Sequence, residues 1–220
     1  MFDIHCHILP GVDDGAKDID VSKGLIKQEI DNGVKYICLT PHQNSRNLNK
    51  EGLIEVFNNL KKEIGDEINL FLGCELYYYD SMIRDLKDGK ILTMNNSKYV
   101  LVEFSTRLET PISDILYDIK VNGYIPIIAH IERYSYLTLK DYDEISKYAL
   151  IQVNSKSLSD KYYKKQMKYL FKNKLVSFIA SDCHNLDRRC CDFTEAKKII
   201  SKKYKDQYDK LFNNLPEFLK

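Results

Sequence analysis

Seven short runs of apolar residues recur along this chain, and segments with apolar positions at helical spacing separate them. Most runs are continuously apolar, which is typical of strands that are covered on both faces in a parallel sheet. The runs comprise residues 2–7, 34–40, 68–73, 99–104, 124–129, 150–153 and 176–180. The pattern therefore predicts seven β/α units.

Two of the intervening segments show clear helix boundaries. Residues 18–33 begin at Asp18 and end in Asn-Gly, a pair that favours a helix C-terminus. Residues 110–123 begin with Thr110 as an N-cap and Pro111 in the first turn, and they also end in Asn-Gly. The expected buried faces comprise Ile19, Ile26 and Ile30 in the first helix and Ile112, Ile115, Leu116 and Ile119 in the second.

Chain length and the absence of linkers favour one domain that spans residues 1–220. We expect an α/β fold in which the seven units form a single closed or nearly closed barrel. A doubly wound open sheet is the alternative. The first strand lacks the glycine-rich fingerprint that such sheets use to bind nucleotides, which weakens a nucleotide-binding interpretation.

Charge is balanced, with 33 basic and 32 acidic residues, which excludes broad electrostatic attraction to nucleic acid or anionic membranes. No apolar run approaches the roughly 20 residues that span a bilayer, and from the first residues we expect no signal peptide. We therefore expect a cytoplasmic protein without membrane insertion. In a reducing compartment its six cysteines are expected to be small buried apolar residues rather than disulfides.

Metal-competent side chains lie at the ends of all the predicted strands except the sixth. In parallel α/β folds these ends converge on one mouth, where sites are built. On the first strand His5 and His7 are two residues apart, so both can point at one ion while Cys6 points away. The full set is His5, His7, Asp14, His42, Glu75, Glu103, His130, Asp182 and His184, which includes all five histidines.

This set exceeds what one ion needs, so the sequence predicts two or three divalent ions with a bridging carboxylate such as Glu75. A mixed set of imidazoles and carboxylates suits Mn, Fe or Zn. Paired ions serve hydrolysis, and phosphoester hydrolysis is the natural reaction class. An arginine is then needed to pair with phosphate oxygens, and Arg133, Arg188 and Arg189 all follow expected ligands closely.

The combined motifs resemble the polymerase and histidinol phosphatase (PHP) family. The motifs are His5-x-His7, Asp14-Gly15, Pro41-His42, Gly73-Cys74-Glu75, Ala129-His130 and Ser181-Asp182-Cys183-His184. Longer segments are similar to the bacterial manganese-dependent protein-tyrosine phosphatases of capsule and exopolysaccharide operons. These segments include residues 3–8, 12–15, 75–78, 128–134, 152–155 and 180–187.

The resemblance implies a distorted seven-stranded barrel with a trinuclear centre, in which manganese is expected and iron or zinc are alternatives. One ion would be held by His5, His7, Glu75 and Asp182, a second by Glu75, Glu103 and His130, and the third by Asp14, His42 and His184. Arg133 and Arg189 match phosphate-binding arginines, with Arg188 as an alternative to Arg189 and Asp13 as an alternative to Asp14. The implied substrate is phosphotyrosine on a cognate tyrosine autokinase of polysaccharide export. The resemblance leaves the oligomeric state open.

Three alternatives remain. In the first, the same centre acts on histidinol phosphate or another small phosphoester in a closed pocket. A phosphotyrosine ring would instead need an open mouth, and aromatic rings could rim it, namely those of Tyr77, Tyr78, Tyr79, Tyr134 and Tyr136. A metal-binding regulatory module without activity is the second. Finally, Cys183 and Arg189 have the C-x5-R spacing of cysteine-based phosphatases, although Asp187 would lie where that loop holds phosphate.

Overall fold

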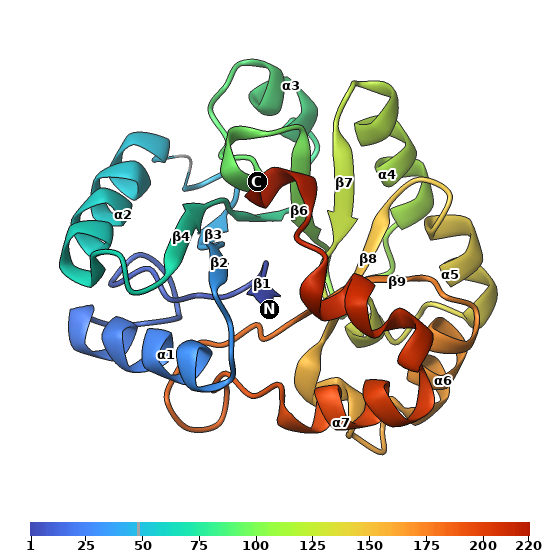
Figure 1. Cartoon of the computed structure of the whole chain (residues 1–220). Coiled ribbons are helices and arrows are strands. Elements are labelled where there is room, and N and C mark those ends of the chain that lie inside the picture. The colour runs from blue at the N-terminus through green and yellow to red at the C-terminus, as the bar shows by residue number, and fades with distance from the viewer. Residues whose placement is uncertain (48) are drawn as a thin grey trace.

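The computed structural model describes residues 1–47 and 49–220, and it shows a ring of parallel strands enclosed by helices (Figure 1). The strands are β1 (Phe2–Asp3), β2 (Tyr36–Leu39), β3 (His42–Gln43), β4 (Asn69–Leu72), β5 (Glu75–Tyr77), β6 (Tyr99–Glu103), β7 (Ile125–Ile128), β8 (Leu150–Asn154) and β9 (Val176–Ala180). Two predicted strands are each followed by a further short strand outside the predicted range: β3 follows β2 after Thr40-Pro41, and β5 follows β4 after Gly73-Cys74. Pro41 has no N–H to donate to a ladder, which explains why pairing is interrupted between β2 and β3.

The strands follow one another around the ring in chain order. β1, β2 and β4 pair in parallel, as do β3, β5, β6, β7, β8 and β9. The last strand returns to the first, because Asp182 N–H donates to the His5 carbonyl and His7 N–H donates to the Cys183 carbonyl, both at 2.8 Å. A doubly wound sheet reverses its strand order at a switch point. The sequential order confirms the predicted barrel-type α/β fold instead.

The first strand ends earlier than the predicted range 2–7. His5 N–H donates to Asp3 Oδ1 at 3.1 Å, and Cys6 N–H donates to Thr40 Oγ1 at 3.1 Å. Side chains thus take amide hydrogens that a strand ladder would use. Regular pairing of β1 therefore stops at Asp3.

The helices lie on the outside of the ring (Figure 1). They are α1 (Ile19–Asp31), α2 (Lys50–Ile64), α3 (Met82–Lys87), α4 (Ile112–Val121), α5 (Leu139–Ile145), α6 (Lys164–Lys172) and α7 (Thr194–Lys203). Single turns lie at Met94–Asn96, Ile131–Arg133, Ser155–Leu158, Lys205–Gln207, Asp209–Asn213 and Glu217–Leu219. Across the two described ranges, none of the helices combines the length and apolar character that crossing a bilayer requires.

Both helices with predicted boundaries are present, with two corrections. Asp18 caps α1 as predicted, but Ile30 is 37% exposed. The buried face of α1 comprises Ser22, Leu25, Ile26 and Glu29. Thr110 does not cap α4, because its hydroxyl donates to the Leu108 carbonyl and the helix begins after Pro111.

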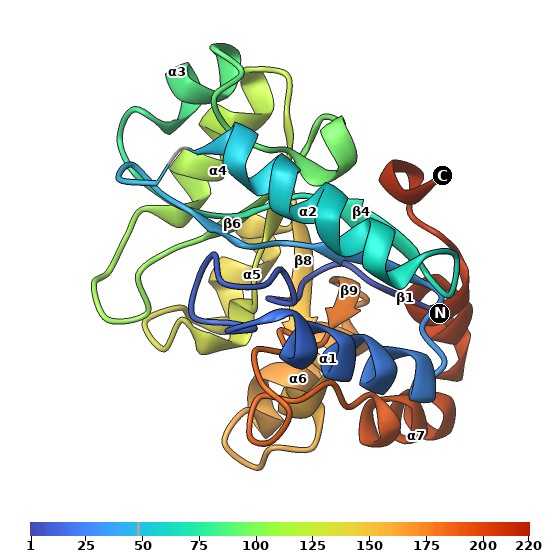
Figure 2. The same cartoon turned by 90° about the vertical axis from the view of Figure 1, so that its left-hand side faces the viewer.

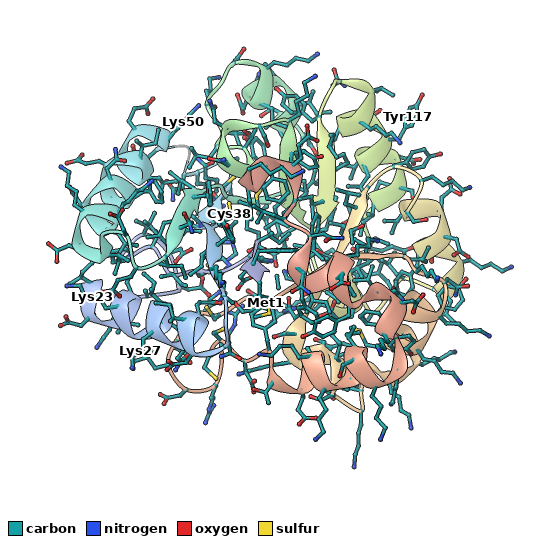
Figure 3. All side chains as sticks on the ribbon, viewed as in Figure 1. Met1, Lys23, Lys27, Cys38, Lys50 and Tyr117 are labelled. Carbon is teal, nitrogen blue, oxygen red and sulfur yellow. The ribbon has the colours of Figure 1, made fainter. Side chains whose placement is uncertain are left out.

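Alternating residues of the strands divide the apolar core into two layers. Leu101 and Ile127 belong to an inner layer, whereas their neighbours Val102 and Ile128 pack between the strands and the helices. Figure 3 shows Cys38, another residue of the inner layer, in the middle of the molecule. Lys23, Lys27 and Tyr117 extend from the outer surface in the same view.

The last residues of the chain cover one end of the inner layer. The Phe218 ring lies 4.9 Å from that of Tyr99 and 6.0 Å from that of Phe178, and Asn95 Nδ2 donates to the Phe218 carbonyl at 2.7 Å. Figure 2 shows the two chain termini together on the right, while the loops that follow β1, β6 and β7 extend to the left. The covered end is therefore opposite to the strand ends that carry the expected ligands.

We predict that Phe218→Ala lowers the free energy of unfolding by about 3–5 kcal/mol, because it removes a buried ring from the end of the barrel. Denaturant unfolding measures the change. Tyr162→Ala is the matched control, since that ring is 71% exposed, and it should change stability by about 0.5 kcal/mol or less. Equal losses in the two variants would contradict this account of the chain end.

Candidate metal centre

The strand ends bring the expected ligand side chains to one end of the barrel. Most of these side chains are buried, and Asp14 and His42 are the more exposed of them, at 63% and 31%. His42 begins β3, Glu75 begins β5 and Glu103 ends β6, whereas His5, His7 and Asp14 follow β1, His130 follows β7, and Asp182 and His184 follow β9. The predicted convergence is therefore present in the fold.

Glu75 lies at the centre of the group and contacts four imidazoles. Its carboxylate oxygens lie 3.2 Å from His5 Nε2, 3.3 Å from His7 Nε2, 3.1 Å from His42 Nδ1 and 2.9 Å from His130 Nε2. Both oxygens are used. This is the geometry that a bridging carboxylate requires.

Asp182 joins His5 and His7 on one side of Glu75. Asp182 Oδ1 lies 3.7 Å from His5 Nε2 and 3.6 Å from His7 Nε2, and the two Nε2 atoms are 3.3 Å apart. The four residues that the resemblance implies for the first ion therefore meet at one place.

The second nitrogen of each of these imidazoles has a partner of its own. His5 Nδ1 lies 3.1 Å from Gln152 Oε1, and His7 Nδ1 lies 2.8 Å from Asp13 Oδ2. Both partners accept, so each Nδ1 donates and each Nε2 faces the cluster. Two ring nitrogens that lie 3.3 Å apart beside the carboxylate of Glu75 are arranged as a shared cation requires. The donor set therefore fits a metal ion, with the outer-shell partners that metal-binding histidines require.

Asp14, His42 and His184 form an outer group near the solvent. Asp14 Oδ1 lies 3.4 Å from His42 Nε2 and 3.5 Å from His184 Nε2. His184 Nδ1 lies 3.0 Å from the Asp182 carbonyl, and the buried Nε2 atom has no hydrogen-bond partner in the described part of the chain. An imidazole held in this way offers its Nε2 lone pair to an ion.

Asp13 and Asp14 have different surroundings, which separates the two alternatives. Asp13 Oδ2 accepts from His7 and from His42 N–H, and its Oδ1 accepts from Gly15 N–H. Burial would raise the pKa of Asp13, but these hydrogen bonds lower it to about 2. Asp13 is therefore fully engaged as a partner of a histidine, whereas Asp14 faces the cluster.

The loop that carries both aspartates passes close to the backbone of the first strand. A Cβ at Gly15 would lie 2.1 Å from the His7 carbonyl oxygen, which leaves room only for glycine. Ala16 N–H donates to the same carbonyl at 2.9 Å. This close approach brings Asp13 and Asp14 back over the histidines that precede them.

Three groups of donor atoms in the described residues are compact enough for an ion, with all their donor atoms within 4.8 Å of one another. They are His7 with Asp14, His42 and His184; His5 with His7 and Glu75; and His42 with Glu75 and Glu103. The last group contains His42 where the resemblance implies His130. His130 Nε2 nevertheless lies 3.4 Å from Glu103 Oε1, so both imidazoles reach this pair of carboxylates.

Carboxylate contacts and burial act in opposite directions on the pKa of these groups. Burial would lower the pKa of His130, but Glu103 and Glu75 raise it to about 10. Burial would raise the pKa of Glu75, but His5, His130 and His42 hold it well below its usual range. Burial and the neighbouring His7 lower the pKa of His184 to about 3, so its ring is neutral and its Nε2 lone pair is available.

Arg133 and Arg189 lie on the rim of the cluster and share one carboxylate. Arg189 Nη2 lies 2.9 Å from Asp182 Oδ1, and Arg133 Nη1 lies 3.5 Å from Asp182 Oδ2. The two side chains are 40% and 36% exposed, so each is accessible from the mouth. The Arg188 side chain is exposed, and its own backbone carbonyl accepts from Lys156 Nζ at 3.1 Å. The geometry favours Arg189 over Arg188.

Of the five tyrosines expected at the mouth, Tyr77 is the exposed one, at 39%. Tyr134 is buried, and its hydroxyl oxygen accepts from the backbone N–H of Phe104 at 3.1 Å. The other three are partly buried: the Tyr78 ring packs on Phe104, the Tyr79 hydroxyl bonds Asp85, and the Tyr136 hydroxyl donates to the Ser105 carbonyl. Most of these rings therefore stabilise the loops around the mouth.

Cys183 faces away from the cluster, as strand alternation predicts. It is fully buried, and its Sγ lies 3.7 Å from Glu29 Oε1 on the side of α1. Asp182 and His184, its neighbours in the chain, point into the mouth instead. A thiol that is buried on the side of α1 is not placed to attack a substrate in the mouth.

Sequence reasoning missed the side chains that orient the ligands. Asp13 was considered only as an alternative ligand, and Gln152 and Asn154 of β8 were given no role. Gln152 Oε1 contacts His5, and Asn154 Nδ2 donates to Asp182 Oδ2 at 2.8 Å. Their spacing of two residues was a usable signal, because it places both amides on the inner face of a strand that has no ligand of its own.

Comparison with known proteins assigns the family. The family model for capsular polysaccharide synthesis, CpsB/CapC, matches residues 1–219. Tyrosine-protein phosphatase CpsB of Streptococcus agalactiae serotype V is 35% identical, covering 96% of this chain and 95% of its own length. Tyrosine-protein phosphatase YwqE of Bacillus subtilis is 32% identical, covering all of this chain and 91% of its own.

Solved structures agree with these relatives. A structure from the work on B. subtilis YwqE and Streptococcus pneumoniae CpsB, described as metal-dependent tyrosine phosphatases, matches with a TM-score of 0.83 at 31% identity. It covers 93% of this chain and 87% of the other. Histidinol phosphate phosphatase of Lactococcus lactis shares the fold at 15% identity, with a TM-score of 0.63 over 91% and 92% of the two chains. The chain therefore belongs to the CpsB/CapC family of capsular polysaccharide synthesis proteins.

Proposed function

We propose that this chain is a metal-dependent protein-tyrosine phosphatase that uses two or three divalent ions, with manganese as the native metal. The main support for this proposal is that five imidazoles and four carboxylates lie together at one end of the barrel, next to two arginines at its rim. The ligands are His5, His7, Asp14, His42, Glu75, Glu103, His130, Asp182 and His184, and Arg133 and Arg189 bind the phosphate.

The chemistry follows from the residues of the mouth. When bound, divalent ions supply Lewis acidity at the phosphate and lower the pKa of water towards neutrality. Arg133 and Arg189 hold phosphate oxygens, because a guanidinium pairs with them in a planar fork. Asp182 contacts both guanidinium groups and keeps them turned towards the mouth. Water then attacks phosphorus, the bond between phosphorus and the tyrosine oxygen breaks, and one proton of the water ends on that oxygen, so that tyrosine and phosphate leave.

The substrate of this proposal is phosphotyrosine on a protein, as the names of the relatives suggest. Tyr77 supports it, since this exposed ring follows Glu75 by two residues on β5 and can pack against a phosphotyrosine ring. The partner in this proposal is a tyrosine autokinase of polysaccharide export, which fits a family of capsular polysaccharide synthesis proteins.

We predict that purified protein releases phosphate from a phosphotyrosine peptide in Mn²⁺, loses this activity in chelator, and regains it when Mn²⁺ is restored. Parallel assays with Zn²⁺, Fe²⁺ and Mg²⁺ identify the preferred metal. Histidinol phosphate is the control substrate and should be hydrolysed more slowly. Faster hydrolysis of histidinol phosphate would select a small-substrate phosphatase, and no hydrolysis with any metal would leave a binding module.

In the same assay, Cys183→Ser should keep most of the wild-type kcat/KM. The reason is that the thiol faces Glu29 in the core and not the mouth. A melting curve confirms that the variant is folded. Complete loss of activity in a folded Cys183→Ser protein would instead favour the cysteine mechanism.

We predict that Arg189→Ala lowers kcat/KM for the phosphotyrosine peptide about 10- to 100-fold, since a charge-assisted hydrogen bond contributes about 1.5–3 kcal/mol. Arg188→Ala is the matched control: the neighbouring arginine is exposed and should be dispensable. Steady-state kinetics on both variants shows which of the two arginines contributes to kcat/KM. The assignment is wrong if Arg188→Ala has the larger effect.

A further inference from the structure

Neither β8 nor the turn that follows it supplies a proposed ligand, yet the strand lies between β7 and β9, which precede His130 and Asp182. Gln152 and Asn154 occupy alternate positions on β8, so their side chains share one face. The flanking Ile151 and Val153 belong to the outer apolar layer, which places both amides on the inner face. The strand therefore presents two polar side chains where its neighbours present ligands.

The amide of Gln152 contacts two of the proposed ligands. Its Oε1 accepts from the backbone N–H of His130 at 2.6 Å and from His5 Nδ1 at 3.1 Å. A backbone N–H can only donate, so the His130 contact establishes that the amide oxygen faces this side. Gln152 is fully buried, and water cannot replace it as an acceptor.

The other end of this amide continues to Asn154. Gln152 Nε2 donates to Asn154 Oδ1 at 2.9 Å, and Asn154 Nδ2 donates to Asp182 Oδ2 at 2.8 Å. The direction of every hydrogen bond is determined, since Asn154 must accept with its oxygen and donate with its nitrogen. The result is a continuous chain of amides from His5 and His130 to Asp182.

The two ligands at the ends of this chain have strained backbones. His130 has a φ of 30° and Asp182 a φ of 51°, both in the left-handed region that residues other than glycine rarely adopt. Such conformations persist where surrounding contacts hold them. Gln152 binds the backbone of His130, and Asn154 binds the side chain of Asp182, so β8 contacts both strained positions.

We infer that Gln152 and Asn154 form a positioning relay that sets the affinity of the centre for its metal ions. The inference rests on the ligands proposed above and adds two residues that do not touch the metal. Gln152 holds His5 with its Nε2 towards Glu75, and Asn154 leaves Asp182 Oδ1 directed at the cluster. Outer-shell partners of this kind change metal affinity about 10- to 100-fold when they are removed.

The test is Mn²⁺ binding to the chelator-treated full chain, measured by isothermal titration calorimetry. Gln152→Met keeps a side chain of similar size without the amide, and it should weaken Mn²⁺ binding about 10- to 100-fold. Asn154→Ala, at a partly exposed position, should also weaken binding. The double variant should lose less than the product of the two single losses, because both substitutions break the same relay.

Gln207→Met is the matched control. Gln207 is a buried glutamine in the C-terminal segment, and its Nε2 donates to the Phe171 carbonyl at 2.9 Å. This variant should lose stability and keep the wild-type affinity for Mn²⁺, which separates positioning from a general effect of removing a buried amide.

The outcomes separate the relay from the proposed function. Wild-type affinity in folded Gln152→Met, or in Asn154→Ala if the first variant does not fold, would overturn the relay while the metal centre stands. Multiplicative losses in the double variant would overturn the connection between the two amides. A wild-type chain that binds no Mn²⁺, Zn²⁺ or Fe²⁺ would overturn the metal centre and the relay together.

Discussion

The contact between the buried carboxylate of Glu75 and four imidazoles is the interaction on which the site depends. An isolated carboxylate in a protein interior is costly, and it is tolerated only when charge partners and hydrogen bonds compensate. Those partners come from the ends of different strands, so Glu75 is compensated only when the barrel has closed. The same contact therefore connects the fold with the chemistry: the ring brings the imidazoles together, and the carboxylate gives them a common centre.

Around this centre, four of the proposed ligands are each held by a hydrogen bond to a neighbouring group. Asp13 holds His7, the Asp182 carbonyl holds His184, and the amides of β8 hold His5 and Asp182. These contacts determine which nitrogen of each ring faces the cluster. A site with the same ligands and no such partners would present the wrong lone pairs, and its rings would be free to turn. β8 orients residues that follow other strands, which explains why it contacts the centre although it supplies no proposed ligand.

The barrel separates the site from the parts of the molecule that maintain stability. The inner apolar layer and the Phe218 segment occupy the end with the chain termini, and the polar cluster occupies the other (Figure 2). Loops at the mouth can therefore vary without changing the core. Histidinol phosphate phosphatase shares this fold at 15% identity, so the fold tolerates extensive change in sequence.

The sequence by itself determined the seven strand segments, their parallel arrangement and the residue types at their ends. Continuous apolar runs and the two-residue spacing of His5 and His7 are local properties of the chain, and parallel strands necessarily converge at one end. Only the tertiary structure decided that Asp14 and not Asp13 faces the cluster, that Arg189 reaches Asp182, and that β1 ends at Asp3. It also decided that Ile30 is exposed and that Gln152 contacts His5 and His130. Each of these outcomes depends on a particular hydrogen bond or packing contact, and a local pattern specifies at most which face of a strand a side chain occupies, not the partner that it meets there.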